Sequence, residues 1–288
     1  MAFLAQLWGG GDPFSFVLSM FFLVVFFMFY PRLMLTQIMW KLERTVRELE
    51  ELSADAKDTI LREISEKPDK KVQASVTRFL DFFMISPVGL DPYGIVRKFE
   101  HLIQGQRDRF HYFVKQVAPH ASADGQANLE MGLAGGISLN EIMKIVRHYV
   151  EIVKQTKSFQ IAMILQMQLP LIERVAKAVH KGTKTLVKGQ PIGDAAGPYM
   201  VARLIGDAKV REAEEDIMLA RKDLLGRDIF LLKARGPAGR LGRPGLVVDK
   251  LAKQHKFAKI ISIDAAAKLE GERTGSVAEG VGVAMGGV

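Results

Sequence analysis

Two aspartates that follow short apolar runs are the residues of this chain best suited to chemistry. Asp194 lies in the turn Gly189–Pro198, after the run Thr185–Lys188, and Asp264 ends the run Lys259–Ile263. Strand ends in a parallel α/β sheet collect ligands, because the loops and helix N-termini there point at open space. Two carboxylates at two such ends can each be a ligand of a divalent metal, or act on a water as general acid and base. Alternatively, each aspartate only caps the helix that follows it.

A second candidate site is the basic loop Gly236–Gly245, where glycines and prolines alternate with basic residues. Backbone amides near Gly239 can approach a phosphate, and Arg240 and Arg243 can clamp it in a bidentate manner. The loop matches neither a Walker loop nor a dinucleotide-binding fingerprint. It predicts an anion site, with a solvated basic surface loop as the alternative.

The elements that would position these residues form an α/β pattern after residue 181. We expect an α/β three-layer domain with a parallel sheet, because strands alternate with helices and right-handed crossovers bring strand ends to one edge. The chain ends inside the glycine-rich stretch Gly280–Val288, which predicts a missing C-terminal segment. The expected strands are Thr185–Lys188, Asp228–Lys233 and Lys259–Asp264; the expected helices are Pro198–Ile205, a mostly helical Asp207–Arg227, and Gly245–His255.

The N-terminal part predicts a membrane anchor. Phe14–Tyr30 is a run of 17 residues without a charge, close to the roughly 20 that cross a bilayer. No lysine or arginine precedes the run, whereas Arg32, Lys41, Arg44 and Arg47 follow it, so the positive-inside rule places the bulk of the chain in the cytoplasm.

A helical region is predicted between the anchor and the α/β part. Apolar residues three and four apart from Leu35 to Ala56 form a heptad seam, which predicts either a short coiled coil or an amphipathic helix packed on the next domain. We expect further helices over Lys71–Met84, Tyr93–Val117, Ala127–Lys157 and Ser158–Val179. The predicted domains are therefore an anchor (1–31), a membrane-proximal helix (32–67), a helical domain (68–181) and the α/β domain (182–288).

Composition limits the chemistry and the partners. The chain has no cysteine, which excludes disulfides, thiol nucleophiles and cysteine-ligated zinc. Its 288 residues carry a net charge of +8, which fits anionic lipid; nucleic acid is a less favoured partner.

Three C-terminal pieces resemble the hydrogenase-maturation endopeptidases and the spore germination protease, which share a phosphorylase/hydrolase-like fold. Asp194 stands three residues before Gly197, as the acid does in their first turn, and Ile261–Ala265 is similar to the germination protease's second acidic strand end. The stretch Thr274–Gly282, with Gly275 and Gly280, is similar to its glycine-rich loop. This resemblance implies a peptidase-like hydrolase.

The whole chain resembles an archaeal family of membrane-anchored proteins, the domain of unknown function 1512. The resemblance rests on the anchor, Ile145–Tyr149, Gln166–Ile172, the Asp194 turn and Asp264–Glu272. It implies an archaeal origin and a membrane location, without an activity.

Three functional hypotheses follow. The first is a single-pass membrane protein whose cytoplasmic domain is a divalent-metal or paired-carboxylate hydrolase, with Asp194 and Asp264 as catalytic and metal residues and glycine-loop amides stabilising an oxyanion. The second is a non-catalytic membrane scaffold or adaptor that forms homo-oligomers or binds another membrane protein. It is favoured by the lack of histidine in 274–282. The third is a phosphate-ligand binder that uses Arg240 and Arg243.

Overall fold

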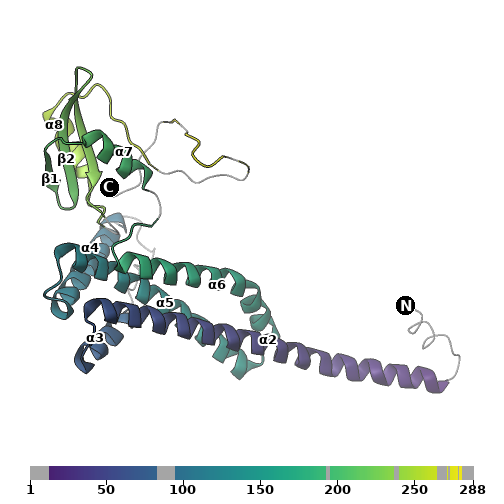
Figure 1. Ribbon diagram of the computed structural model, residues 1–288. Helices are drawn as coiled ribbons and strands as arrows, with labels where there is room; N and C mark the ends of the chain where they lie inside the picture. Colours follow the sequence, from purple (N-terminus) through teal and green to yellow (C-terminus); the bar gives the residue numbers. More distant parts are fainter. Residues whose placement is uncertain are drawn as a thin grey trace. The chain divides into compact units, whose positions relative to one another are not determined.

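The computed structural model describes residues 13–82, 95–192, 195–236, 240–264, 271, 273–277 and 279–280. In chain order these residues form α2 (Pro13–Ile64), α3 (Lys70–Leu80), α4 (Ile95–Val117), α5 (Ala123–Thr156), α6 (Phe159–Val187), α7 (Ala196–Ile205), β1 (Val210–Glu214), β2 (Ile217–Leu224), β3 (Arg227–Ala234) and α8 (Pro244–Gln254) (Figure 1). They divide into two compact units. The first comprises Met1–Asp58, Thr77–Phe82 and Gly136–Lys181, and the second comprises Thr59–Val76, Phe83–Gly135 and Gly182–Val288.

Helix α2 runs without a break for 52 residues through the predicted anchor and the predicted seam. Its large apolar side chains from Phe16 to Tyr30 are exposed, with Phe27 at 67%. Among the residues described, α2 is the one helix long and apolar enough to span a membrane.

The seam of α2 is buried against α5 and α6. Ile38, Leu42 and Leu49 belong to an apolar cluster that also contains residues of α5 and α6, such as Val146 and Leu169. Of the two alternatives for the seam, the amphipathic helix packed on neighbouring helices is the one observed, because its own chain supplies the covering side chains. The seam residues that belong to this cluster or are buried are Leu35, Ile38, Leu42, Thr45, Leu49, Leu52 and Ala56.

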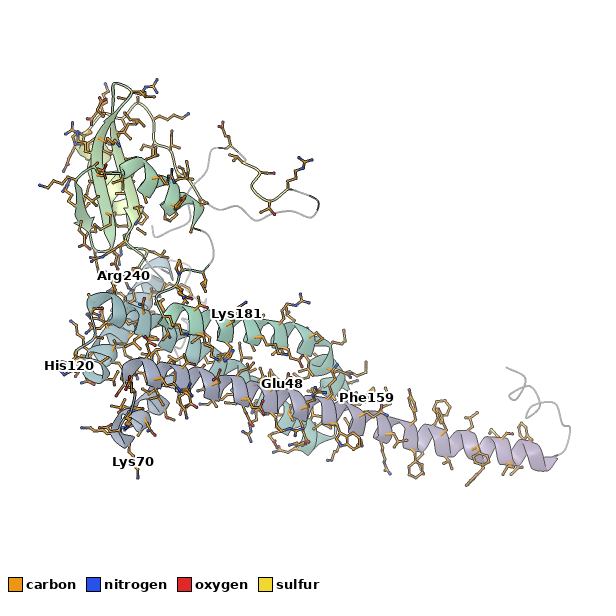
Figure 2. The ribbon with its side chains drawn as sticks, in the orientation of Figure 1. Glu48, Lys70, His120, Phe159, Lys181 and Arg240 are labelled. Carbon is orange, nitrogen blue, oxygen red and sulfur yellow. The ribbon has the colours of Figure 1, made fainter. Side chains whose placement is uncertain are left out.

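Polar contacts along the seam fix the directions of the three helices. On α6, Glu173 accepts a hydrogen bond from Thr45 Oγ1 at 2.7 Å, and His180 Nε2 lies 2.6 Å from Asp55 Oδ2. The residue numbers of the contacting pairs increase in the same direction along both helices, so α6 runs parallel to α2. On α5 the order is reversed, since Lys154 pairs with Glu43 at 3.3 Å and Arg147 with Glu50. The α5–α6 hairpin therefore has its tip, where Phe159 is labelled in Figure 2, beside α2.

The predicted helices of the middle region are confirmed within a few residues where the structure describes them. The exception is α6, which continues eight residues beyond Val179. The predicted strand Thr185–Lys188 is wrong. Its Thr-Leu-Val sequence is the last turn of α6, closed by a Schellman motif in which Gly189 has φ +70° and Gln190 N–H donates to Thr185 O at 3.1 Å.

The second unit contains a three-stranded antiparallel sheet in the order β1-β2-β3. The parallel sheet and the three-layer α/β fold that we predicted are therefore corrected. Asp207–Arg227, predicted to be a charged and mostly helical stretch, is instead a hairpin of two strands, and Lys259–Asp264 forms no strand. Tertiary burial overrides helix propensity here, as it often does.

Burial on both faces of the sheet explains why it forms. On one face Ile217 and Leu219 pack with Val247 and Leu251 of α8, and on the other Ala220 and Leu231 pack with Ile205 of α7. The alternation of strand side chains supplies both faces. The predicted strand Asp228–Lys233 and the predicted helices Pro198–Ile205 and Gly245–His255 are confirmed.

Candidate functional site

Of the two candidate carboxylates, the structure describes Asp264; Asp194 lies outside the described residues. Asp264 follows an irregular segment that passes close to the start of α7. At Gly197 an added Cβ would lie 2.3 Å from the carbonyl oxygen of Ile263 and 3.9 Å from the backbone nitrogen of Asp264. Only glycine allows this approach, since real Cβ atoms do not come so near a backbone oxygen. The glycine three residues after Asp194 therefore brings the Asp264 segment to the first turn of α7.

The N-cap residue of α7 does not cap the helix with its side chain. This residue is Ala195, with φ −101°, and its side chain makes no capping hydrogen bond. Helix N-termini favour negative charge, because their free N–H groups and the helix dipole point outwards. A carboxylate near this turn, such as that of Asp264, is thus electrostatically compatible with α7.

Arg240 of the predicted anion loop forms ion pairs with acidic residues of its own unit. Its Nε donates to Asp216 Oδ1 at 2.9 Å, and its Nη1 pairs with Asp124 of α5. The side chains of Arg240 and Asp216 are only 13% and 11% exposed. Burial opposes the charge of Arg240, but hydrogen bonds to Asp216 and Asp124 outweigh it and raise the pKa of Arg240.

The turn between β1 and β2 holds Asp216 for this contact. Asp216 adopts φ +60°, its N–H donates to Glu212 Oε1 at 3.0 Å, and its carbonyl accepts from Arg235 N–H at 2.7 Å. Arg107 of α4 approaches its other carboxylate oxygen at 3.8 Å. We call Arg240, Asp216, Asp124 and Arg107 the Arg240 cluster.

Gly242 shows that the loop is shaped to pack on the sheet. It has φ +59°, and an added Cβ would lie 2.6 Å from both the carbonyl oxygen of Glu215 and the side chain of Ile217. Gly242 and Arg240 therefore both make contacts within the protein. The Arg240 cluster has the arrangement of a structural ion-pair cluster.

The other predicted site residues are not members of the Arg240 cluster as defined above. Arg243 is the N-cap residue of α8, with Pro244 as the first helical residue. Gly275 has φ +90° in an exposed turn closed by a hydrogen bond from Ser276 N–H to Arg273 O, and Gly280 is exposed. Gly239 lies outside the described residues. Within the described part of the chain, no group of three or more histidines and acids could hold a metal ion.

Sequence reasoning missed Asp124, Asp216 and Arg107. Asp124 is 116 positions from Arg240, and no local pattern relates two residues at that separation. Asp216 carried a weak signal, because an aspartate tolerates the left-handed conformation that a tight turn requires. It was overlooked because the surrounding residues were interpreted as helix.

The first unit has its own polar site, a hollow of about 210 Å³ between α2, α3 and α5. Asn140, buried on α5, donates to Leu80 O at 2.8 Å and to Asp81 Oδ1 at 3.0 Å, while Lys144 Nζ lies 2.6 Å from the same oxygen. These donors, Lys144 first and Asn140 second, lower the pKa of Asp81 against the effect of burial. Asn140 donates a hydrogen bond to a free carbonyl at the C-terminal end of α3. Its contact is therefore that of a side chain that caps a helix C-terminus.

Comparison with protein-family models covers nearly the whole chain. The model for the protein of unknown function DUF1512 N-terminal domain matches residues 16–189, and the model for the DUF1512 C-terminal domain matches residues 192–288. The chain belongs to the DUF1512 family. Only Gln190 and Pro191 separate the two matched parts of this DUF1512 chain, at the Schellman motif that closes α6. No curated protein and no solved structure matches the chain.

Proposed function

We propose that this protein is a single-pass membrane scaffold, with its N-terminus outside and the remainder of the chain in the cytoplasm. One observation carries the proposal: α2 is one uninterrupted helix that is exposed and apolar from Phe16 to Tyr30 and packed against α5 and α6 from Leu35 onwards. A continuous helix transmits position and orientation, whereas a linker does not.

The two parts of α2 fit two environments. An 18-residue window of the helix has a mean hydropathy of 2.0 and none of it is buried, which suits hydrocarbon. After it, the positive charges of Arg32, Lys41 and Arg44 favour the cytoplasmic side. Arg147 pairs with Glu50, which lies 20 residues beyond Tyr30, so α5 is held about 30 Å along the helix from the end of the apolar run.

The orientation can be tested with single cysteines, because the chain has none of its own. We expect Ala2→Cys to react with a membrane-impermeant maleimide in intact cells and Arg47→Cys to react only after permeabilisation. The reverse pattern would contradict the orientation, and recovery of the wild-type chain in the soluble fraction would contradict the anchor.

The scaffold itself can be tested by energy transfer from a label on His148→Cys to acceptor lipids. Insertion of Gly-Pro-Gly after Arg32, ahead of the first packed residue Leu35, should broaden the distance distribution because it breaks the helix. Insertion of Ala-Ala-Ala at the same place is the matched control, since it keeps the helix and lengthens it by about 4.5 Å. Equal broadening by both insertions would contradict a rigid connection.

A second candidate function is a divalent-metal, paired-carboxylate hydrolase of the peptidase type, with Asp194 and Asp264 as ligands or general acid and base. The close approach of Ile263 and Asp264 to Gly197 is the observation that favours it. If the two carboxylates share one ion, Asp264→Asn should weaken zinc, nickel or manganese binding at least tenfold, whereas Asp249→Asn on α8 should not. Equal binding by wild type and Asp264→Asn would leave the scaffold as the better account.

The third hypothesis, binding of a phosphate-bearing ligand, is weakened by the Arg240 cluster. An incoming anion would have to displace Asp216 and Asp124 from Arg240, and both are charge-assisted partners already in place. The test is salt-sensitive phosphate binding that is lost when Arg240 and Arg243 are both replaced by alanine.

A further inference from the structure

The outward face of α6 carries an apolar ridge that no described part of the chain covers. Four residues spaced four apart form the ridge, and Ile164 lies beside its first turn. Met167 is 74% exposed, Ile164 63% and Leu171 58%. The ridge residues are Met163, Met167, Leu171 and Val175.

The first three ridge residues lie in a stretch without charge. From Phe159 to Ile172 there is no charged residue, and the next one, Glu173, turns towards Thr45 of α2. The chain as a whole carries a net charge of +8, so two identical copies repel each other on balance. This face is free of that repulsion over about 21 Å of helix.

The direction of α6 decides between the candidate occupants of the ridge. Because α6 runs parallel to α2, the 12 residue steps from Met163 to Val175 extend about 18 Å along the direction of the proposed anchor. A bilayer surface could cover only its first turn. A second anchored copy, held in the same orientation by the same membrane, presents the same ridge to it from the side.

We propose that this ridge is a self-association surface, on which α6 of one copy packs against α6 of another. Residues four apart form the ridges that interdigitate when two helices cross at about −50°, and identical ridges can do so about a two-fold axis. The surface goes beyond the scaffold function, although anchoring strengthens it by orienting the copies. The seam from Leu35 to Ala56 cannot serve this purpose, since α5 and α6 of the same chain bury it.

The experiment uses the full chain in membranes with single cysteines at Met167→Cys, Leu171→Cys and Ile145→Cys. Ile145 on α5 is the matched control, because it is 57% exposed and Leu171 is 58% exposed. Under mild oxidation we expect roughly tenfold more disulfide-linked dimer from the two α6 positions, because a disulfide needs two Cβ atoms about 4 Å apart.

A disruptive variant sharpens the test. Met167→Asp, added to Leu171→Cys, should lower the dimer yield about tenfold because two carboxylates would face each other without water. Gln168→Asp, one residue away on the exposed side of the same helix, adds the same charge off the ridge and should lower the yield much less.

Three results would overturn the proposal. Equal yields at positions 145, 167 and 171 would mean random collision. A label on Met167→Cys that is quenched by nitroxide lipids without any dimer would mean that lipid covers the ridge. A label that is shielded in a protein that stays monomeric would mean that the chain itself covers it. Membrane retention is measured on the same samples, so cross-linking by a chain that is not retained would overturn the anchor and leave self-association standing.

Discussion

Two sets of ion pairs, one from each unit of the chain, differ in how deeply their side chains are buried. In the first unit, ion pairs such as Glu50–Arg147 and Glu48–Lys177 border an apolar seam, and each of these side chains is at least 35% exposed. In the second unit, Arg240 and Asp216 pair where their side chains are only 13% and 11% exposed. Exposed pairs contribute little because water screens them, whereas breaking a buried pair leaves a charge without a partner. The same residue types therefore align a helix in one unit and hold a loop in the other.

The largest effect should come from the apolar seam, which the comparison identifies as the main support of the first unit. Leu49→Ala removes a side chain that is 1% exposed and should lower the free energy of unfolding by about 2–5 kcal/mol. The measurement is denaturant unfolding in detergent, followed by circular dichroism. Leu225→Ala, at a residue 89% exposed, is the control and should change little; a loss of less than about 1 kcal/mol for Leu49→Ala would contradict the assignment.

The next largest effect should come from Arg240→Ala in the second unit. It leaves Asp216 without its arginine in a buried turn, which should cost roughly 2–3 kcal/mol and loosen the loop before α8. Limited proteolysis of that loop is the measurement.

Arg240→Lys is the informative partner of this variant. Lysine keeps the charge but lacks the fork that reaches Asp216 and Asp124 together, so we expect an intermediate loss. If Arg240→Ala left both stability and cleavage unchanged, the buried pair would be no stronger than an exposed one, and the contrast between the units would fail.

A smaller effect is expected from the border pairs of the first unit. A double-mutant cycle of Glu50→Gln and Arg147→Ala should give a coupling of about 0.2–1 kcal/mol that fades as salt is raised, because both groups are reached by solvent. A coupling above about 2 kcal/mol that is insensitive to salt would mean that this pair behaves energetically like the buried Arg240 cluster.

The smallest effect is a pH dependence at Asp81. Its pKa in the folded chain is lowered by Lys144 and Asn140, so its contribution to stability is complete above the unfolded pKa of about 4 and is lost as pH falls through the lower folded value. Lys144→Ala should make the unfolding free energy less dependent on pH in the acid range below about 4. An unchanged acid dependence would mean that Lys144 is not the main partner of Asp81.

Local patterns predicted the helices well and the C-terminal strands poorly. The spacing of Leu35 to Ala56 is enough to define a helix face, because that period belongs to a single element. Thr185–Val187 was misread because a helix that ends in β-branched residues before glycine resembles a strand before a turn. The segment Asp207–Arg227 reads as a charged helix, and the burial of Ile217 and Leu219 under α8 and of Ala220 under α7 explains why it is a hairpin.

The candidate site divides in the same way. The sequence singled out Arg240 and its glycine-rich loop as an anion site, whereas in the structure Gly242 packs that loop against Glu215 and Ile217. The sequence did not reveal that Arg240 already pairs with two acidic residues of the same chain, since Asp124 and Asp216 lie at distant positions in the sequence. The glycine at 197 was singled out for its distance from Asp194. Its partner, the segment before Asp264, became visible only in three dimensions.

The sequence alone determined that α2 begins as an apolar, uncharged helix and continues with an apolar face, because composition and a period of three to four residues are local properties. The tertiary structure decided what covers each face: α5 and α6 cover the seam, two carboxylates cover Arg240, and within the described residues nothing covers the ridge of α6. The physical reason is that burial and ion pairing depend on contacts between segments that are distant in the sequence. No short stretch of the chain determines such contacts.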